Sequence, residues 1–153
     1  MKTIKKEFKY VDYLWDDDKS ASFGDNQVDL FLYRSNILGA DLRITNYGGG
    51  NTSCRTIEKD PLTNEDVEVM WIKGSGGDIG TLNRSGIAGI YVNRLRDLKN
   101  VYKGLEDEDR MVGLFNHCIY DLDSKAPSID TPLHGLLPFA HIDHPYLIYA
   151  GRL

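Results

Sequence analysis

The first strong pattern along the chain is helical. From Gln27 to Leu38 apolar residues recur every three or four positions, so that Leu30, Tyr33 and Ile37 share one face. Gly39 follows directly, and glycine often ends a helix because it adopts a left-handed conformation without steric penalty. We therefore expect a helix over 27–38 that terminates at Gly39.

Strands are predicted where short apolar runs lie between turn residues. Segment 67–72 is rich in β-branched and aromatic residues, and weaker β-like runs cover 41–45 and 52–58. Between 52–58 and 67–72, an Asp-Pro pair and an asparagine indicate a turn over 59–66. We expect the strand over 41–45 to enter a glycine-rich loop and the strand over 52–58 to return from it.

Further helices are predicted in the second half of the chain. Asn83 suits the N-cap of a helix that runs to about residue 99. Segment 106–121 has an acidic first turn and an apolar stripe, and Thr131-Pro132 suits the start of a short helix that ends near residue 138. With a β-like segment at 146–150, this alternation favours a layered α/β or α+β domain.

The N-terminal residues differ from the rest in composition. Residues 1–26 are polar and contain an acidic run, which is typical of an arm. Tyr10, Tyr13 and Trp15 are its candidate anchors on the body. We expect an N-terminal arm over 1–26 and one folded domain over 27–153.

Composition narrows the classes of function. The chain has 153 residues, 41% of them apolar and 27% charged, which is enough for one domain with a core. A net charge of −5 argues against a general binder of nucleic acid or anionic membranes. Neither a secretory leader nor a membrane span is predicted, so we expect a cytoplasmic protein. Cys54 and Cys118 lie far apart in the chain, which favours two reduced thiols over a disulfide.

Two glycine-rich loops carry the candidate chemistry. They cover 46–53 and 73–78 and hold six of the 15 glycines. Glycine lets backbone N–H groups turn toward an anion, and the asparagine, serine and lysine side chains of these loops add donors. The loops therefore indicate a phosphate pocket built from both, although each could be an ordinary turn. Neither loop matches the Walker or dinucleotide motifs.

Two later segments add ionisable groups. Ser128 and Asp130 precede the short helix predicted at Thr131, where Asp130 could simply stabilise the helix N-terminus. His141 and His144 lie three positions apart, so they would share a face on a helix but point to opposite faces of a strand. His134 is expected to be a packed or capping side chain.

In this order, the motifs Gly-Gly-Gly-Asn-Thr-Ser, Lys-Gly-Ser-Gly-Gly-Asp, Ala-Pro-Ser-Ile-Asp-Thr-Pro-Leu-His and His-Ile-Asp-His resemble the class II aldolase/adducin family. They are most similar to the aldolase domain of bifunctional rhamnulose-1-phosphate aldolase/short-chain dehydrogenases, over about 27–144. The resemblance implies an α/β/α sandwich around a largely antiparallel sheet and a homo-oligomer. It also implies a divalent metal, typically zinc, held by three histidines. Such enzymes cleave a 1-phosphorylated ketose to dihydroxyacetone phosphate and an aldehyde.

The resemblance also implies roles for individual residues. Asp130 falls where the family has its acidic catalytic residue, which moves a proton to or from the substrate. His144 falls on the first metal-binding histidine. The phosphate-site positions of the family match Gly50, Asn51, Ser75, Gly76 and Ser128.

The chain departs from the family after His144. Pro145 and Tyr146 follow, whereas the family places a second histidine two residues on and a third far downstream. His141 could join His144 only if this segment were helical. We therefore expect a partial domain, incomplete at its C-terminus, with an impaired metal site. The alternative is a non-catalytic module for sugar-phosphate binding or assembly. The expected partner is a phosphorylated sugar, with no nucleic acid and no membrane.

Overall fold

The computed structural model describes residues 13–104 and 108–145. Short 3-10 turns, including η1 (Ile79–Thr81), η2 (Arg84–Gly86) and η5 (Phe115–Cys118), connect the longer elements. Those elements are, in chain order, α1 (Asp17–Ser22), α2 (Gln27–Ala40), β1 (Asn51–Lys59), β2 (Asp66–Lys73), β3 (Ile87–Tyr91), α3 (Val92–Asp97), α4 (Glu108–Leu114), α5 (Thr131–Leu136) and β4 (His141–His144).

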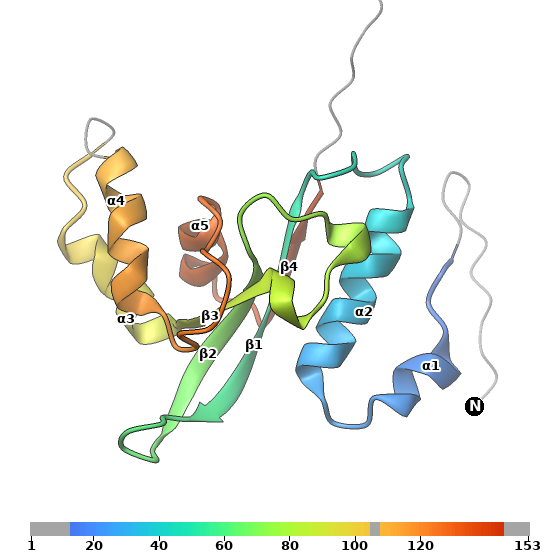
Figure 1. The fold of residues 1–153 in the computed structure, drawn as a ribbon, viewed down its shortest axis with the longest axis horizontal. Coiled ribbons are helices and arrows are strands. Elements are labelled where there is room, and N and C mark those ends of the chain that lie inside the picture. Colours follow the sequence, from blue (N-terminus) through green and yellow to red (C-terminus); the bar gives the residue numbers. More distant parts are fainter. Residues whose placement is uncertain (1–12, 105–107, 146–153) are drawn as a thin grey trace, which may run out of the picture.

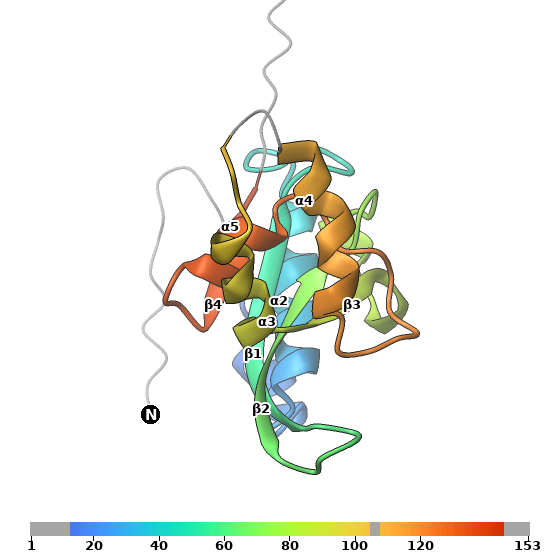
Figure 2. The ribbon, with the colours of Figure 1, turned by 90° about the vertical axis from the view of Figure 1, so that its left-hand side faces the viewer.

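The described strands form one four-stranded sheet in the order β3-β2-β1-β4, and every pair is antiparallel. Strands β1 and β2 make a hairpin that closes at the Lys59↔Asp66 pair. Helix α2 covers one face of the sheet, and α3, α4 and α5 lie on the other side (Figures 1 and 2). The prediction of a layered α/β domain with a largely antiparallel sheet is confirmed.

Each face of the sheet has its own apolar cluster. On the α2 face, Phe31 packs with Cys54 of β1, and both are fully buried. The opposite cluster joins alternate residues of β2, Met70 and Ile72, to α3, β3 and the turn after α4. The two clusters therefore pack against opposite faces of the sheet.

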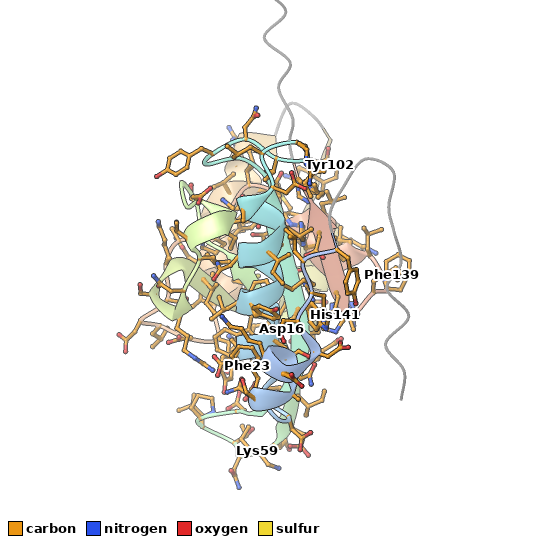
Figure 3. All side chains as sticks on the ribbon, turned by 90° about the vertical axis from the view of Figure 1, so that its right-hand side faces the viewer. Asp16, Phe23, Lys59, Tyr102, Phe139 and His141 are labelled. Atoms are coloured by element: carbon orange, nitrogen blue, oxygen red, sulfur yellow. The ribbon has the colours of Figure 1, made fainter. Side chains whose placement is uncertain are left out.

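The segment before α2 packs beside that helix, as Figure 3 shows with Asp16 and Phe23. The rings of Trp15 and Tyr33 lie 5.2 Å apart, and the backbone N–H of Asp16 donates to the Tyr33 hydroxyl at 3.0 Å. Tyr13 is about half exposed. Tyr10 lies outside the described residues.

The predicted end of the first helix is wrong by two residues. Helix α2 continues through Gly39 to Ala40. Gly39 instead serves a close approach, because a Cβ there would lie 2.0 Å from the backbone nitrogen of Gly80. The predicted strand over 41–45 is also wrong, since the Asp41 carboxylate accepts from the backbone N–H of Arg43 and holds the chain in a turn.

The helix predicted from Asn83 to about residue 99 is wrong over residues 87–91, whereas α3 and the 3-10 turn after it confirm its second half. Asn83 caps only η2, and residues 87–91 form β3, in which every residue is buried. An apolar run that is buried all round does not distinguish strand from helix, and pairing with β2 decided for strand here. The helix predicted over 106–121 appears as α4 followed by η5, and residues 105–107 lie outside the described part.

Of the other predicted helices and strands, some are confirmed and one lies outside the described residues. The start of α2, the β1–β2 hairpin, the core of β2 and α5 are confirmed. The β-like segment 146–150 lies outside the described residues. Among the helices of residues 13–104 and 108–145, none has the length and apolar character needed to cross a membrane.

Candidate functional site

The two glycine-rich loops lie against each other. The backbone N–H of Gly48 in the first loop donates to Asp78 Oδ1 in the second at 2.9 Å. The second loop is also tied to the segment before α5, because the N–H of Ser75 donates to the carbonyl oxygen of Ala126 at 2.9 Å. Three segments that are far apart in sequence therefore converge at one end of the sheet.

Glycine is required at two points of these loops by backbone conformation. Gly50 has a φ of 72° and Gly76 a φ of 68°, a region that other residues rarely adopt. At Gly50 a Cβ would also lie 2.9 Å from the Cα of Pro145. The first loop therefore passes β4 at a distance that only glycine permits.

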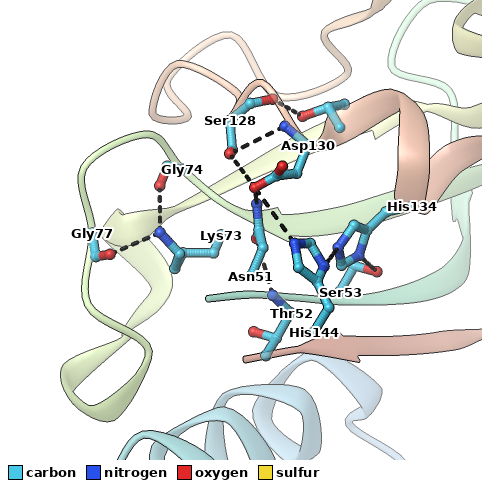
Figure 4. A network of polar contacts seen from close by, with 11 residues as sticks. Asn51, Thr52, Ser53, Lys73, Gly74, Gly77, Ser128, Asp130, His134 and His144 are labelled. Atoms are coloured by element: carbon cyan, nitrogen blue, oxygen red, sulfur yellow. Dashed lines mark hydrogen bonds and ion pairs between the residues drawn. The ribbon is translucent and has the colours of Figure 1, made fainter. Parts of the chain in front are cut away.

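Asp130 lies where the first loop meets the segment before α5 (Figure 4). Its Oδ2 accepts from Ser128 Oγ at 3.3 Å and from Asn51 Nδ2 at 3.4 Å. Asp130 occupies the N-cap position of α5, but its side chain makes no capping hydrogen bond. The structure therefore directs this carboxylate toward Asn51 and Ser128 and not toward the helix backbone.

Lys73 lies beneath the second loop, and its burial goes beyond the role of loop donor that the sequence predicts. Its side chain is buried, and Nζ donates to the carbonyl oxygens of Gly77 at 2.7 Å and Gly74 at 3.5 Å. Burial lowers the pKa of Lys73, and the negative charge of Asp130 partly opposes that shift. A lysine that ends a buried strand and begins a glycine loop was the sequence signal that could have identified it.

His134 and His144 form a second part of the network. His134 Nδ1 lies 2.6 Å from Ser53 Oγ, and His134 Nε2 lies 2.7 Å from His144 Nδ1. His144 Nε2 in turn lies 3.6 Å from Asp130 Oδ2. His134 is fully buried. Burial and the neighbouring His144, against the opposing effect of Asp130, together lower the pKa of His134 to about 4.

His141 lies away from this network. Residues 141–144 form strand β4, so the helical arrangement that would join His141 to His144 is not present. His141 Nδ1 instead contacts Arg34 of α2 at 2.9 Å, and burial together with the Arg34 charge lowers its pKa. The idea that His141 and His144 share a metal is therefore corrected by the geometry of the strand.

The described residues do not fit a catalytic zinc site. Such a site normally uses three protein ligands and one open position. Within 13–104 and 108–145, no group of three or more His, Cys, Asp or Glu side chains is arranged to hold a metal ion. Nδ1 of His144 is already hydrogen-bonded to His134. Tyr146, where the family has its second histidine, lies outside the described residues.

The chain is similar in sequence to one curated protein and in structure to one solved domain. No family model matches the chain. It is 38% identical over 136 residues to the uncharacterized oxidoreductase YuxG of Bacillus subtilis (strain 168), covering 89% of this chain and 19% of that protein. Its structure is similar to the N-terminal class II aldolase domain of a conserved protein from Thermoplasma acidophilum, with a TM-score of 0.69 and 28% identity over 78% of this chain and 54% of that one.

The chain thus spans about a fifth of its curated relative and about half of the solved domain. The four-stranded antiparallel sheet with helices on both faces matches the solved aldolase domain. The resemblance predicted from the glycine loops, the Asp130 segment and the histidines is confirmed at this level. In its fold and in the order of its motifs, the chain is similar to class II aldolase domains.

Proposed function

We propose that this chain binds the phosphoryl group of a phosphorylated ketose, of the rhamnulose 1-phosphate type, between its two glycine loops and Ser128. The observation that carries the proposal is the convergence of the two glycine loops and the segment that carries Ser128 and Asp130. The Gly48–Asp78 and Ser75–Ala126 hydrogen bonds hold the loops together, and Asn51 and Ser128 both contact the Asp130 carboxylate.

The electrostatics of the pocket support an anionic ligand. The left-handed glycines at positions 50 and 76 allow backbone N–H groups to face a phosphoryl oxygen. The Lys73 ammonium group lies directly under the second loop, where it is shielded from water. A buried positive charge acts strongly on a nearby anion because the local dielectric constant is low. The net charge of −5 is therefore compatible with a locally positive pocket.

Asp130 is proposed to face the sugar beside the phosphoryl group. A carboxylate at this place can accept or return a proton when a bond next to a carbonyl breaks. Asn51 and Ser128 hold one of its oxygens and so fix its orientation. In intact class II aldolases a bound zinc ion would stabilise the negative charge that develops on the ketose oxygens.

We further propose that retro-aldol cleavage is impaired in this chain. The described residues offer His144 but do not assemble three ligands around it. The second candidate function follows from the same observation: a sugar-phosphate-binding or assembly module without catalysis. Both proposals predict phosphate-ester binding, and they differ in whether zinc adds turnover.

Calorimetry with rhamnulose 1-phosphate and with unphosphorylated rhamnulose tests the binding proposal. We expect binding of the phosphate ester alone. Ser75→Asp should reduce that affinity at least tenfold, because a second negative charge would face the phosphoryl group, whereas the matched Ser85→Asp change in exposed η2 should not. Equal binding of both sugars would contradict the pocket.

A coupled assay for dihydroxyacetone phosphate separates the two candidates. With added zinc, an impaired aldolase should give slow but measurable product, whereas a pure binding module should give none. A chelator should leave the affinity for the phosphate ester unchanged in either case. Rapid zinc-dependent turnover would show that the metal site is intact and would contradict the impairment.

A further inference from the structure

We propose that Ser53, His134 and His144 form one directed hydrogen-bond relay that presents a protonated Nε2 of His144 to the Asp130 carboxylate. In this relay His134 and Ser53 are positioning residues, and only His144 faces the pocket. The inference deepens the proposed function and rests on it only for the role of Asp130. The hydrogen-bond arrangement itself can be tested independently.

The relay is built on one face of the sheet. Asn51 and His144 are direct cross-strand partners in β1 and β4, and Ser53, two residues along β1, points to the same side. His134 projects from α5 between Ser53 and His144 (Figure 4). Its ring centroid lies 4.8 Å from that of His144, with the planes tilted by 49°, so the rings meet through their nitrogens and not by stacking.

Burial keeps water away from His134 and Ser53, so these residues bond to protein partners. His134 is 0% exposed and Ser53 is 2% exposed. Both ring nitrogens of His134 have protein partners at 2.6 and 2.7 Å, so water is not needed to satisfy them. A buried polar chain of this kind acts as one unit, because removing one member leaves the next without a partner.

With neutral imidazoles, the hydrogen bonds of the relay can run in two directions. In the first, the Ser53 hydroxyl donates to His134 Nδ1, and His134 Nε2–H donates to His144 Nδ1. The remaining proton of His144 then lies on Nε2 and faces the carboxylate. In the second, every bond is reversed, and a bare Nε2 lone pair faces the carboxylate oxygen.

The carboxylate selects the first direction. An ionised carboxylate only accepts hydrogen bonds, and Oδ2 of Asp130 lies 3.6 Å from His144 Nε2. Ser128 and Asn51 already donate to that oxygen, so Nε2–H adds a third proton directed at one acceptor. With the reversed hydrogen bonds, the lone pair of His144 Nε2 would instead face the lone pairs of Asp130 Oδ2 in a partly buried site.

This direction has a consequence for cations. A metal-binding imidazole must offer a nitrogen that carries no proton. In the relay, Nδ1 of His144 accepts from His134 while Nε2 carries the proton, so neither nitrogen is available. A cation at His144 would have to reverse both His134 bonds and convert Ser53 from donor to acceptor.

Nitrogen-15 spectra of the full chain, labelled at histidine, test the direction because they report which ring nitrogen is protonated. We expect His134 and His144 both to be protonated at Nε2, with assignments from His134→Gln and from His117→Gln, which changes an exposed histidine outside the relay. Protonation of His144 at Nδ1 in the unsubstituted protein would overturn the proposal without any relay variant.

Substitution of the carboxylate tests what sets the direction. Asp130→Asn gives His144 Nε2 both a donor and an acceptor to face, so it should remove the bias and give a mixture of tautomers at His144. Ser53→Thr keeps a hydroxyl beside His134 and should keep the single tautomer. A single unchanged tautomer in Asp130→Asn would overturn the proposal. Should that variant fail to fold, the unsubstituted protein and Ser53→Thr still decide.

Two titrations complete the experiment. One equivalent of zinc chloride should leave His144 protonated at Nε2, and a switch to Nδ1 would overturn the inference that the relay keeps both nitrogens of His144 from a cation. Addition of inorganic phosphate tests the pocket separately, by shifts at Ser75 and Gly76. An intact relay without phosphate shifts would refute the proposed function alone, and phosphate shifts with a reversed relay would refute this inference alone.

Discussion

The two faces of strand β1 show how one strand serves both stability and chemistry. Toward α2 it presents Cys54, which is sealed in an apolar cluster with Phe31. Burial there raises the pKa of the Cys54 thiol to about 12, which keeps it protonated and unreactive. Toward α5 the same strand presents polar side chains: Asn51 and Ser53 are buried, and the side chain of Arg55 is 8% exposed.

The two faces of β1 are stabilised by different interactions. Buried apolar side chains need only complementary packing, whereas buried polar groups must be hydrogen-bonded. Arg55 donates to the carbonyl oxygens of His134 and Gly135, both at 3.1 Å, and forms an ion pair with Glu68 at 3.2 Å. These bonds secure α5, and with it Asp130, over the sheet. The apolar face therefore stabilises the scaffold, and the polar face orients the site.

The largest expected effect comes from truncation on the apolar face. Phe31→Ala removes a fully buried ring and should lower the free energy of unfolding by about 3–5 kcal/mol. Urea denaturation measures this change. Ile57→Ala, at a mostly exposed position of β1, is the matched control and should shift stability by less than about 0.5 kcal/mol. Similar losses for both would remove the distinction between the two faces.

A pH dependence should appear on the polar face. Burial and the neighbouring His144 together lower the pKa of His134 to about 4 in the folded protein, whereas the pKa of a histidine in the unfolded chain is about 6.5. The unfolded chain then binds more protons between these values, so stability should rise as pH increases from about 4 to 6.5, by at most about 3 kcal/mol. Urea denaturation across this range should show a flatter profile for His134→Gln. His117→Gln should keep the original profile, and a flat profile in the unsubstituted protein would contradict the buried neutral imidazole.

Lys73 should affect affinity more than stability. Lys73→Gln keeps a donor for the Gly77 carbonyl oxygen but removes the buried positive charge. We expect affinity for the phosphate ester to fall about tenfold, which corresponds to about 1.4 kcal/mol. Calorimetry measures this, with Lys59→Gln at the exposed end of the hairpin as the control. An unchanged affinity would mean that the second loop binds through its amides alone.

The smallest expected effect has the opposite sign. Asp130→Asn removes a negative charge beside the proposed phosphoryl position, so phosphate-ester affinity should rise by about 1 kcal/mol, or about fivefold. Calorimetry again provides the measurement, with exposed Asp66→Asn as the control. Weaker binding in Asp130→Asn would show that the carboxylate holds the ligand directly and would place it differently from our proposal.

The candidate site separates residues that the sequence singles out from residues whose contacts only the structure reveals. The glycine loops and the Ser128–Asp130 segment were recognisable because their residue types are unusual for their positions. The sequence predicts Lys73 only as a hydrogen-bond donor in the second loop, because the burial of a lysine cannot be inferred from its neighbours in sequence. His134 was expected to be a packed side chain, and its contacts with Ser53 and His144 depend on two strands and a helix meeting in space.

By itself, the sequence determined the elements whose pattern is local: α2, the β1–β2 hairpin and the start of α5. It also determined the order of motifs that leads to the class II aldolase-like fold. Only the tertiary structure decided that 87–91 and 141–144 are strands, because each becomes one by pairing with a strand distant in sequence. The same pairing sent His141 and His144 to opposite faces, since side chains alternate along a strand with a period of two.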